Sequence, residues 1–253
     1  MNTFKLLDDF TDYTFEEKSH TYTYKGTKVG SSVTQLIGNY VKPFEKDFWA
    51  AKKAKQRGVD KQVVLDEWKF KADCSSTAGT IFHSYMEHML AGKIIDVHER
   101  AAQEEPSIQE IINPRLDQLL PLGQRFIEES RHKLIPIRSE LTVGIEDKVA
   151  GQIDQLFYNE RAGKIEVWDW KTNKAINTKN GYGERLLNPL GHLEACEYTE
   201  YSLQLNIYKA ILIRHGFDIG NCYFVWFNEN NESYLCYQCA ELQTEAEMLL
   251  FRV

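Results

Sequence analysis

The sequence lacks any run of about eighteen apolar residues, the length that a membrane-spanning helix requires. Its first residues, MNTFKLLDDFTDYTFEE, contain no basic segment followed by an apolar one, so no secretory signal is expected. A linker rich in Pro, Gly or Ser is also missing, as are low-complexity tracts and internal repeats. These absences predict one domain, located in the cytoplasm, with no membrane partner.

Cysteine is scarce. The 253 residues include five cysteines at irregular spacings. Because the number is odd and the spacing irregular, we expect reduced thiols rather than the disulfide framework of a secreted domain. With 43% hydrophobic residues, the chain can bury a core of ordinary size. A globular protein is therefore expected.

An excess of positive charge is missing too. The formal net charge is −7, which argues against a protein that coats nucleic acid through a global positive field. The charge does not exclude an enzyme that binds DNA in one basic groove. A site built from carboxylates would then need a divalent cation and nearby Lys and Arg residues to accept a phosphate.

The first part of the chain, residues 1–75, has the pattern of a hairpin followed by helices. Aromatic and polar residues alternate over 13–29, as in a small hairpin. Ser32 and Gln35 then have the spacing of a capping box, which marks a helix start. Helical spacing of apolar residues recurs in two later segments, 43–72 and 77–91.

The second part, residues 76–253, mixes helical and strand patterns. A helical segment over 108–132 precedes LIPIRSELTVGIEDKVAGQIDQLFYN, where β-branched and polar residues alternate as in strands. The turn ERAGK joins this stretch to IEVWDWKT, which predicts a hairpin. Residues 178–198 have no clear period and contain Gly, Asn and Pro, so we predict a long loop there. A helix and two strand-like runs follow. The pattern predicts an α/β fold with a helical N-terminal portion.

The segment EVWDWKTNKA, residues 166–175, ends a predicted strand with an acid and a lysine. Alternation along a strand places Asp169 and Lys171 on one face. Trp168 and Trp170 then lie on the other face and can pack into the core. An isolated pair of this kind is most often an exposed ion pair that contributes little to stability, and this alternative remains open.

A second acid, Asp154, lies in the preceding predicted strand. If the two strands pair as the turn indicates, Asp154 and Asp169 lie side by side, and Gly151 removes a side chain nearby. Adjacent carboxylates repel one another, and a hard cation such as Mg²⁺ removes the conflict because it prefers oxygen ligands. Lys171 beside such a cation would orient or deprotonate an attacking water and offset charge on a phosphate.

Two predicted helices carry further polar residues on one face. His83 and Glu87 are four residues apart, a spacing that suits one metal ligand and a partner for it. On a later helix Gln204 and Tyr208 share a face, with Tyr201 one turn earlier. Each set taken alone is also typical of the polar rim of an ordinary helix.

In their order along the chain, these motifs resemble the RecB-like branch of the PD-(D/E)XK nuclease superfamily. The chain looks closest to phage-type exonucleases and the mitochondrial genome maintenance exonuclease, because DWKTN followed by YSLQLNIYKAIL is similar to their sequences. The motifs span residues 79–208. The matching positions are Gly79, Thr80, His83, Ser139, Glu140, Gly151, Asp154, Asp169, Trp170, Lys171, Gln204 and Tyr208.

The resemblance implies a restriction-endonuclease-like core, in which helices flank a central mixed β-sheet, within a single nuclease domain over 1–253. It implies Mg²⁺ or Mn²⁺ as the cofactor and an exonuclease of phage or bacterial recombination, repair or genome processing. A phage enzyme would act in the cytoplasm of its bacterial host. DNA is then the partner, as single strands or duplex ends. A single-strand annealing or recombination protein and a homo-oligomer are compatible with the resemblance.

The resemblance also implies roles for residues of this chain. The metal ligands would be His83, Asp154, Asp169 and the backbone carbonyl of Trp170. Lys171 would be the catalytic lysine, and Glu140 would line the catalytic site or bind through water. Gln204 and Tyr208 would hold the scissile region of the DNA, with Tyr201 beside them.

The loop 178–198 is a candidate wall for a DNA channel. It carries Lys179 and Arg185, and Lys174 extends the same basic edge, so we predict that these three side chains contact DNA. A mobile surface excursion is the alternative for this loop.

Some relatives hold an iron–sulfur cluster on cysteines, and the spacing here argues against one. Cys236 and Cys239 are an odd number of residues apart in a strand-like run, which sends them to opposite faces, and their distance from Cys222 is unlike the usual close cluster.

Three alternatives to an exonuclease remain open. They are an endonuclease of the same fold, an inactive nuclease-derived DNA-binding module, and an α/β protein whose motif match is accidental.

Overall fold

The computed structural model describes residues 10–17 and 19–251 and divides them into two compact units. Unit 1 holds the described residues up to Val41 together with those from Arg125 onward, and unit 2 holds Lys42–Gln124. Among the described helices, none has the length and apolar character needed to cross a membrane. The single nuclease domain over 1–253 stays a prediction.

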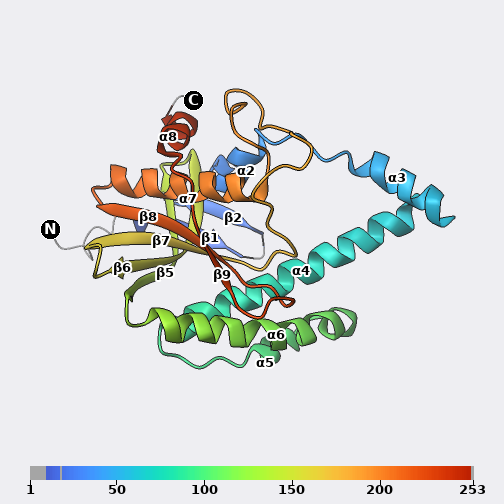
Figure 1. The fold of residues 1–253 in the computed structure, drawn as a ribbon, viewed down its shortest axis with the longest axis horizontal. Helices are drawn as coiled ribbons and strands as arrows, with labels where there is room; N and C mark the ends of the chain where they lie inside the picture. The colour runs from blue at the N-terminus through green and yellow to red at the C-terminus, as the bar shows by residue number, and fades with distance from the viewer. Residues whose placement is uncertain (1–9, 18, 252–253) are drawn as a thin grey trace. The chain divides into compact units, whose positions relative to one another are not determined.

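A mixed six-stranded sheet forms the centre of unit 1 (Figure 1). The hydrogen-bonded order of the strands is β4–β6–β7–β8–β9. Strands β4 and β7 pair with different parts of one edge of β6, and β5 pairs along its other edge. The β4–β6 and β7–β8 pairs are parallel and the remaining pairs are antiparallel. The strands are β4 (Ser31–Ser32), β5 (Leu134–Ile145), β6 (Val149–Asn159), β7 (Lys164–Lys171), β8 (Ile219–Trp226) and β9 (Leu235–Gln238).

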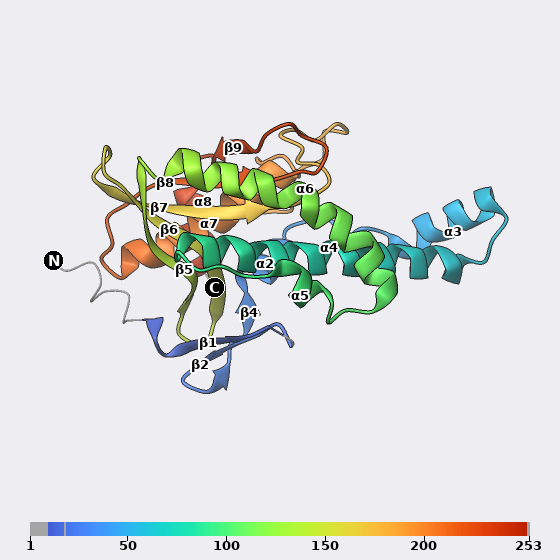
Figure 2. The same cartoon turned by 90° about the horizontal axis from the view of Figure 1, so that it is seen from below.

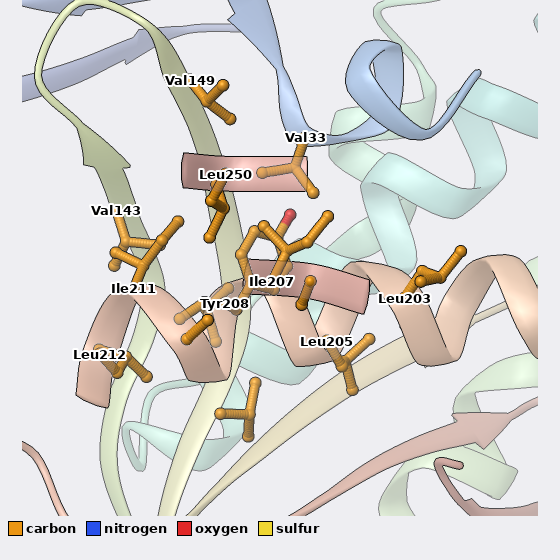
Figure 3. Packing of buried hydrophobic residues seen from close by; sticks show 14 of the residues in the cluster. Val33, Val143, Val149, Leu203, Leu205, Ile207, Tyr208, Ile211, Leu212 and Leu250 are labelled. Atoms are coloured by element: carbon orange, nitrogen blue, oxygen red, sulfur yellow. The ribbon is translucent and has the colours of Figure 1, made fainter. Parts of the chain in front are cut away.

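A helical layer covers one face of this sheet and builds the main apolar core. Helix α7 (Glu197–Arg214) lies along it, and α2 (Val33–Gly38) and α8 (Gln243–Phe251) extend the same apolar core (Figure 3). Together with the mixed sheet, this arrangement confirms the predicted α/β fold of the restriction-endonuclease-like type. Residues that interdigitate there include Val33, Val143, Val149, Leu203, Leu205, Ile207, Tyr208, Ile211, Leu212 and Leu250.

The capping box predicted at the start of α2 is present. The Gln35 backbone N–H donates to the Ser32 hydroxyl at 3.1 Å, and the Ser32 N–H donates to Gln35 Oε1 at 3.0 Å. These two bonds satisfy N–H groups that a helix start leaves without intrahelical partners. They fix α2 directly after the short strand β4.

An aromatic layer covers the opposite face of the sheet. Phe126, near the end of α6 (Pro106–Ser130), lies with its ring centre 5.7 Å from that of Trp168 and 5.2 Å from that of Trp170. It also contacts the rings of Phe157, Phe227 and Tyr234. The tryptophans of β7 therefore point into the core, as their alternation predicts.

Phe126→Ala is expected to lower the free energy of unfolding by about 3–5 kcal/mol, because it removes a buried ring and leaves a cavity beneath the sheet. Urea unfolding followed by near-ultraviolet circular dichroism measures the change. Ile94→Ala is the matched control, since Ile94 is 96% exposed, and it should stay within about 0.5 kcal/mol of the wild type. Equal effects of the two substitutions would contradict the aromatic layer.

The predicted hairpin over 13–29 is a small antiparallel sheet of three strands (Figure 2). Aromatic rings on β1 and β2 meet across it, with Phe15 and Tyr22 stacked at 4.6 Å between ring centres. The strands are β1 (Tyr13–Glu16), β2 (Thr21–Tyr24) and β3 (Thr27–Lys28).

Unit 2 corrects one helix boundary. The segments 43–72 and 77–91 were predicted as separate helices, but α4 (Lys61–Leu90) runs through the interval between them. The break falls earlier, at Gly58, whose left-handed φ of 67° ends α3 (Lys46–Arg57). Asp60 then caps α4 by accepting the Gln62 N–H at 2.7 Å. Helix α5 (Val97–Ala101) follows, and α6 confirms the helical segment predicted over 108–132.

Candidate active site

The end of strand β7 brings an acid and a lysine to one face of the sheet. Lys171 Nζ lies 2.7 Å from Asp169 Oδ2, and the Asp169 side chain is only 4% exposed. The same alternation buries Trp168 and Trp170 against Phe126 on the opposite face. The pair is thus buried, unlike the exposed ion pair that an isolated D-x-K motif usually forms.

Asp154 occupies a gap in the hydrogen-bond ladder of β6. On one edge of β6, β4 pairs with Val149 and Ala150 and β7 pairs from Gln155 onward, so Gly151–Asp154 has no strand partner on that edge. The carboxylate of Asp154 fills the gap by accepting the Trp170 backbone N–H at 2.7 Å. Because Gln155 pairs with Trp168, the next position along brings Asp154 opposite Asp169.

Glu140 approaches Asp154 from the other edge of β6. Ser139 pairs with Gln155 and Leu141 with Ile153, so Glu140 lies opposite Asp154, and one carboxylate oxygen of each lies within 4.8 Å of the other. Glu140 has a left-handed backbone with φ of 50°, which is costly for a residue with a side chain. The Gln152 side chain supports this conformation by donating to the Glu140 carbonyl at 3.2 Å.

The environment of Lys171 keeps its ammonium charged. Burial opposes the charge, but the carboxylates of Asp169 and Asp154 outweigh it and raise the pKa of Lys171 above its usual value. The ammonium also lies 4.3 Å from the centre of the Tyr201 ring and donates to Gln204 Oε1 at 3.2 Å. These contacts therefore hold the Lys171 ammonium, a hydrogen-bond donor, in a fixed orientation.

Helix α7 supplies the residues that hold Lys171. Gln204 Nε2 donates to the Tyr208 hydroxyl at 3.2 Å, so a chain of polar contacts runs from Tyr208 through Gln204 to Lys171. Burial raises the pKa of Tyr201 to about 12 and that of Tyr208 well above its ordinary value, so both phenols are neutral at pH 7.

Gly151 allows Tyr208 to reach this position. A Cβ at Gly151 would lie 2.7 Å from Tyr208 Cε1 and 2.8 Å from the Tyr208 hydroxyl. The glycine three residues before Asp154 is therefore explained by the close approach of a ring from α7.

The other predicted site residues lie in different surroundings. His83 is half-buried on α4, in unit 2. Lys174 and Lys179 are exposed, and the Arg185 guanidinium donates to the His192 carbonyl at 2.7 Å. The structure brings Glu140, Asp154, Asp169, Lys171, Tyr201, Gln204 and Tyr208 together in unit 1.

The predicted loop 178–198, whose last two residues belong to α7, is fixed to unit 1. Leu186 and Leu190 are buried in the core, and Arg185 and Glu194 form an isolated β-bridge. The Asn180 side chain donates to the Ala195 carbonyl at 2.7 Å. These contacts anchor the loop to the core, and its role as the wall of a DNA channel stays a prediction.

Sequence reasoning missed Tyr22 and Gln152. Tyr22 lies on β2, and burial together with the charges of Asp154 and Glu140 raises its pKa to about 12. Tyr22 lies near these acids because of the packing of the small sheet formed by β1, β2 and β3. No spacing in the sequence indicates this packing. Gln152 shares the alternation of Asp154 along β6, and that period of two could have found it.

The buried charges fit a divalent cation. The single ammonium of Lys171 faces the buried carboxylates of Asp154 and Asp169, and the half-buried Glu140 adds a third carboxylate beside Asp154, which leaves an excess of negative charge at the site. Carboxylate and carbonyl oxygens are the ligands that Mg²⁺ and Mn²⁺ prefer. The donor set therefore suits a hard metal ion.

Comparison with known protein families identifies the family of this chain. The sequence model of the PD-(D/E)XK nuclease superfamily matches residues 61–237, which is well over half of the chain. Among solved structures, the chain is similar to one described as "Crystal structure of SSO0001", with 11% identity, a TM-score of 0.32, and coverage of 97% of this chain and 79% of that chain. A search of curated proteins found no match. The chain belongs to the PD-(D/E)XK nuclease superfamily.

Proposed function

We propose that this protein is a DNA exonuclease of the RecB-like branch, which hydrolyses phosphodiester bonds with Mg²⁺ or Mn²⁺ in phage or bacterial recombination, repair or genome processing. Membership in the superfamily implies a nuclease that depends on divalent metal ions and acts on DNA. The observation that carries the proposal is the buried Asp169–Lys171 pair beside Asp154. The similarity of DWKTN and the following helix to phage-type exonucleases supports the finer assignment.

In this proposal Asp154 and Asp169 bind the cation, with the Trp170 carbonyl and His83 as further ligands. A bound cation would act as a Lewis acid on the scissile phosphate. The N–H of Trp170 orients the Asp154 carboxylate, which supports its role. Glu140 lines the same site and binds directly or through water.

Lys171 directs the nucleophile. Its ammonium, held by Asp169 and Gln204, donates a hydrogen bond to the attacking water and offsets the charge that develops on the phosphate. Gln204 fixes the direction of this donor, and Tyr208 fixes Gln204. Tyr201, with its ring against the ammonium, completes the wall next to the DNA.

DNA would pass along the basic edge that follows β7. We propose contacts with phosphates from Lys174, Lys179 and Arg185, carried by a loop that is anchored through Leu186 and Leu190. A single-strand annealing protein as partner and a homo-oligomer belong to the same proposal.

Linear DNA with labelled ends should lose labelled nucleotides in Mg²⁺, while covalently closed circles stay intact, because an exonuclease needs an end. Chelation of the metal should abolish the reaction. Gel analysis of single- and double-stranded substrates measures both effects. Cleavage of the circles would instead favour an endonuclease, and binding without any cleavage would favour an inactive DNA-binding module.

A further inference from the structure

The hairpin formed by α3 and the first turns of α4, residues 42–72, exposes unusually many aromatic rings. Phe44 is 67% exposed, Phe48 58% and Trp49 43%. The buried core of the hairpin is small and comprises Ala50, Ala54 and Val64. The aromatic residues at the start of the hairpin are therefore not needed to fill this core, and an exposed apolar group of this kind marks an interaction surface.

The hairpin is also basic. Residues 42–72 contain nine lysines and arginines against five aspartates and glutamates, in a chain whose formal net charge is −7. Two of these acids are already paired within the hairpin: Arg57 lies 2.6 Å from Glu67, and Lys61 lies 2.7 Å from Asp47. The surface charge presented to a partner is correspondingly positive.

Two lysines of this surface each lie over an aromatic ring. Lys52 Nζ lies 4.7 Å from the centre of the Trp49 ring, and Phe48 meets the same ring edge-on at 5.3 Å. Lys53 Nζ lies 5.8 Å from the centre of the Trp68 ring, and Phe44 lies 6.1 Å from it. Each cluster offers a flat face for a base and a cation for the neighbouring phosphate, the combination that binds single-stranded nucleic acid without sequence preference.

We propose that the α3–α4 hairpin is a binding surface for single-stranded DNA, in which unpaired bases stack on Phe48 and Trp49 and phosphates pair with Lys52 and Lys53. The choice of DNA as the polyanion rests on the proposed nuclease function. The charge excess and the exposed rings, both within unit 2, carry the rest.

The test is the affinity of the full chain for a fluorescein-labelled oligothymidylate, measured by anisotropy in EDTA at several salt concentrations. Phe48→Ala/Trp49→Ala should weaken binding by about tenfold to a hundredfold with little change in salt dependence, because stacking is lost. Lys52→Ala/Lys53→Ala should lower the slope of log Kd against log salt by roughly 1.4, because two phosphate contacts are lost. Trp49→Leu keeps an apolar side chain and should still weaken binding.

Matched controls come from exposed side chains of unit 1. Ile135→Ala/Tyr158→Ala and Lys28→Ala should bind the strand like the wild type. Circular dichroism checks that each variant is folded. The proposal is overturned if the wild type does not bind the strand, if the hairpin variants bind as well as the wild type, or if they change only self-association in light scattering.

The measurement separates this proposal from the nuclease function because no metal is present. If binding depends on the hairpin but the protein never cleaves DNA, the result would support the proposed binding surface and refute the proposed nuclease function. Cleavage by a chain whose hairpin variants all bind like the wild type would refute the surface and leave the nuclease intact.

Discussion

Lys171→Met is expected to reduce DNA cleavage by about a thousandfold in Mg²⁺. Methionine has a similar length but no charge, so it cannot donate to a water or offset charge on a phosphate. The buried contact with Asp169, 2.7 Å in length, and the bond to Gln204 are both lost. Single-turnover release of an end label measures the rate of the chemical step without a contribution from product release.

The same strand provides a matched control. Lys164, at the other end of β7, pairs with Asp218 at 2.6 Å, but this pair is exposed. Lys164→Met therefore makes the same chemical change in an ion pair that contributes little to stability. The Lys164→Met protein should cleave DNA at the wild-type rate. A Lys171→Met protein that cleaves like Lys164→Met would remove the catalytic role of Lys171. Loss of the circular dichroism spectrum would show unfolding, and Lys171→Arg, which retains the charge in a different shape, would then serve as the second variant.

Much of the catalytic strand could be predicted from the sequence because its order is local. The period of two along β7 is a property of any strand, so the division between Asp169 with Lys171 and the two tryptophans needs no tertiary information. The short turn before β7 fixes the register of the hairpin, and this register brings Asp154 opposite Asp169. The capping box at Ser32 is local in the same sense.

Of the features that sequence reasoning missed, the position of Tyr22 depends on contacts between distant segments. Tyr22 reaches the acids because the small sheet of β1, β2 and β3 packs against β5, and the sequence carries no spacing that links them. The break between α3 and α4 was misplaced because Asp73 to Ser76 has weak helix formers, whereas Cys74 is buried and the helix continues through them. Gly58, with its left-handed backbone, was the stronger signal.

Gly151→Ala is expected to lower the free energy of unfolding by about 1–3 kcal/mol and to slow cleavage by about a hundredfold. The new methyl would lie 2.7 Å from Tyr208 Cε1 and 3.0 Å from Val33 Cγ2, closer than such atoms pack. Tyr208 is 2% exposed, so its ring cannot move out to solvent. A displaced Tyr208 no longer holds Gln204, and Gln204 no longer directs Lys171. Urea unfolding and single-turnover cleavage measure the two effects.

A second substitution tests whether the ring is the cause. Tyr208→Leu removes the two nearest atoms that the methyl would meet and leaves the contact with Val33, so Gly151→Ala/Tyr208→Leu should be less destabilised than the sum of the single changes. Cleavage should not recover with stability, because leucine offers no hydroxyl to Gln204. Gly181→Ala is the control, since no atom lies within 4 Å of its added Cβ, and its stability should change by less than about 0.5 kcal/mol. Strictly additive losses would show that Gly151 and Tyr208 act independently, and a double variant that cleaves at the wild-type rate would show that Lys171 does not depend on this chain of contacts.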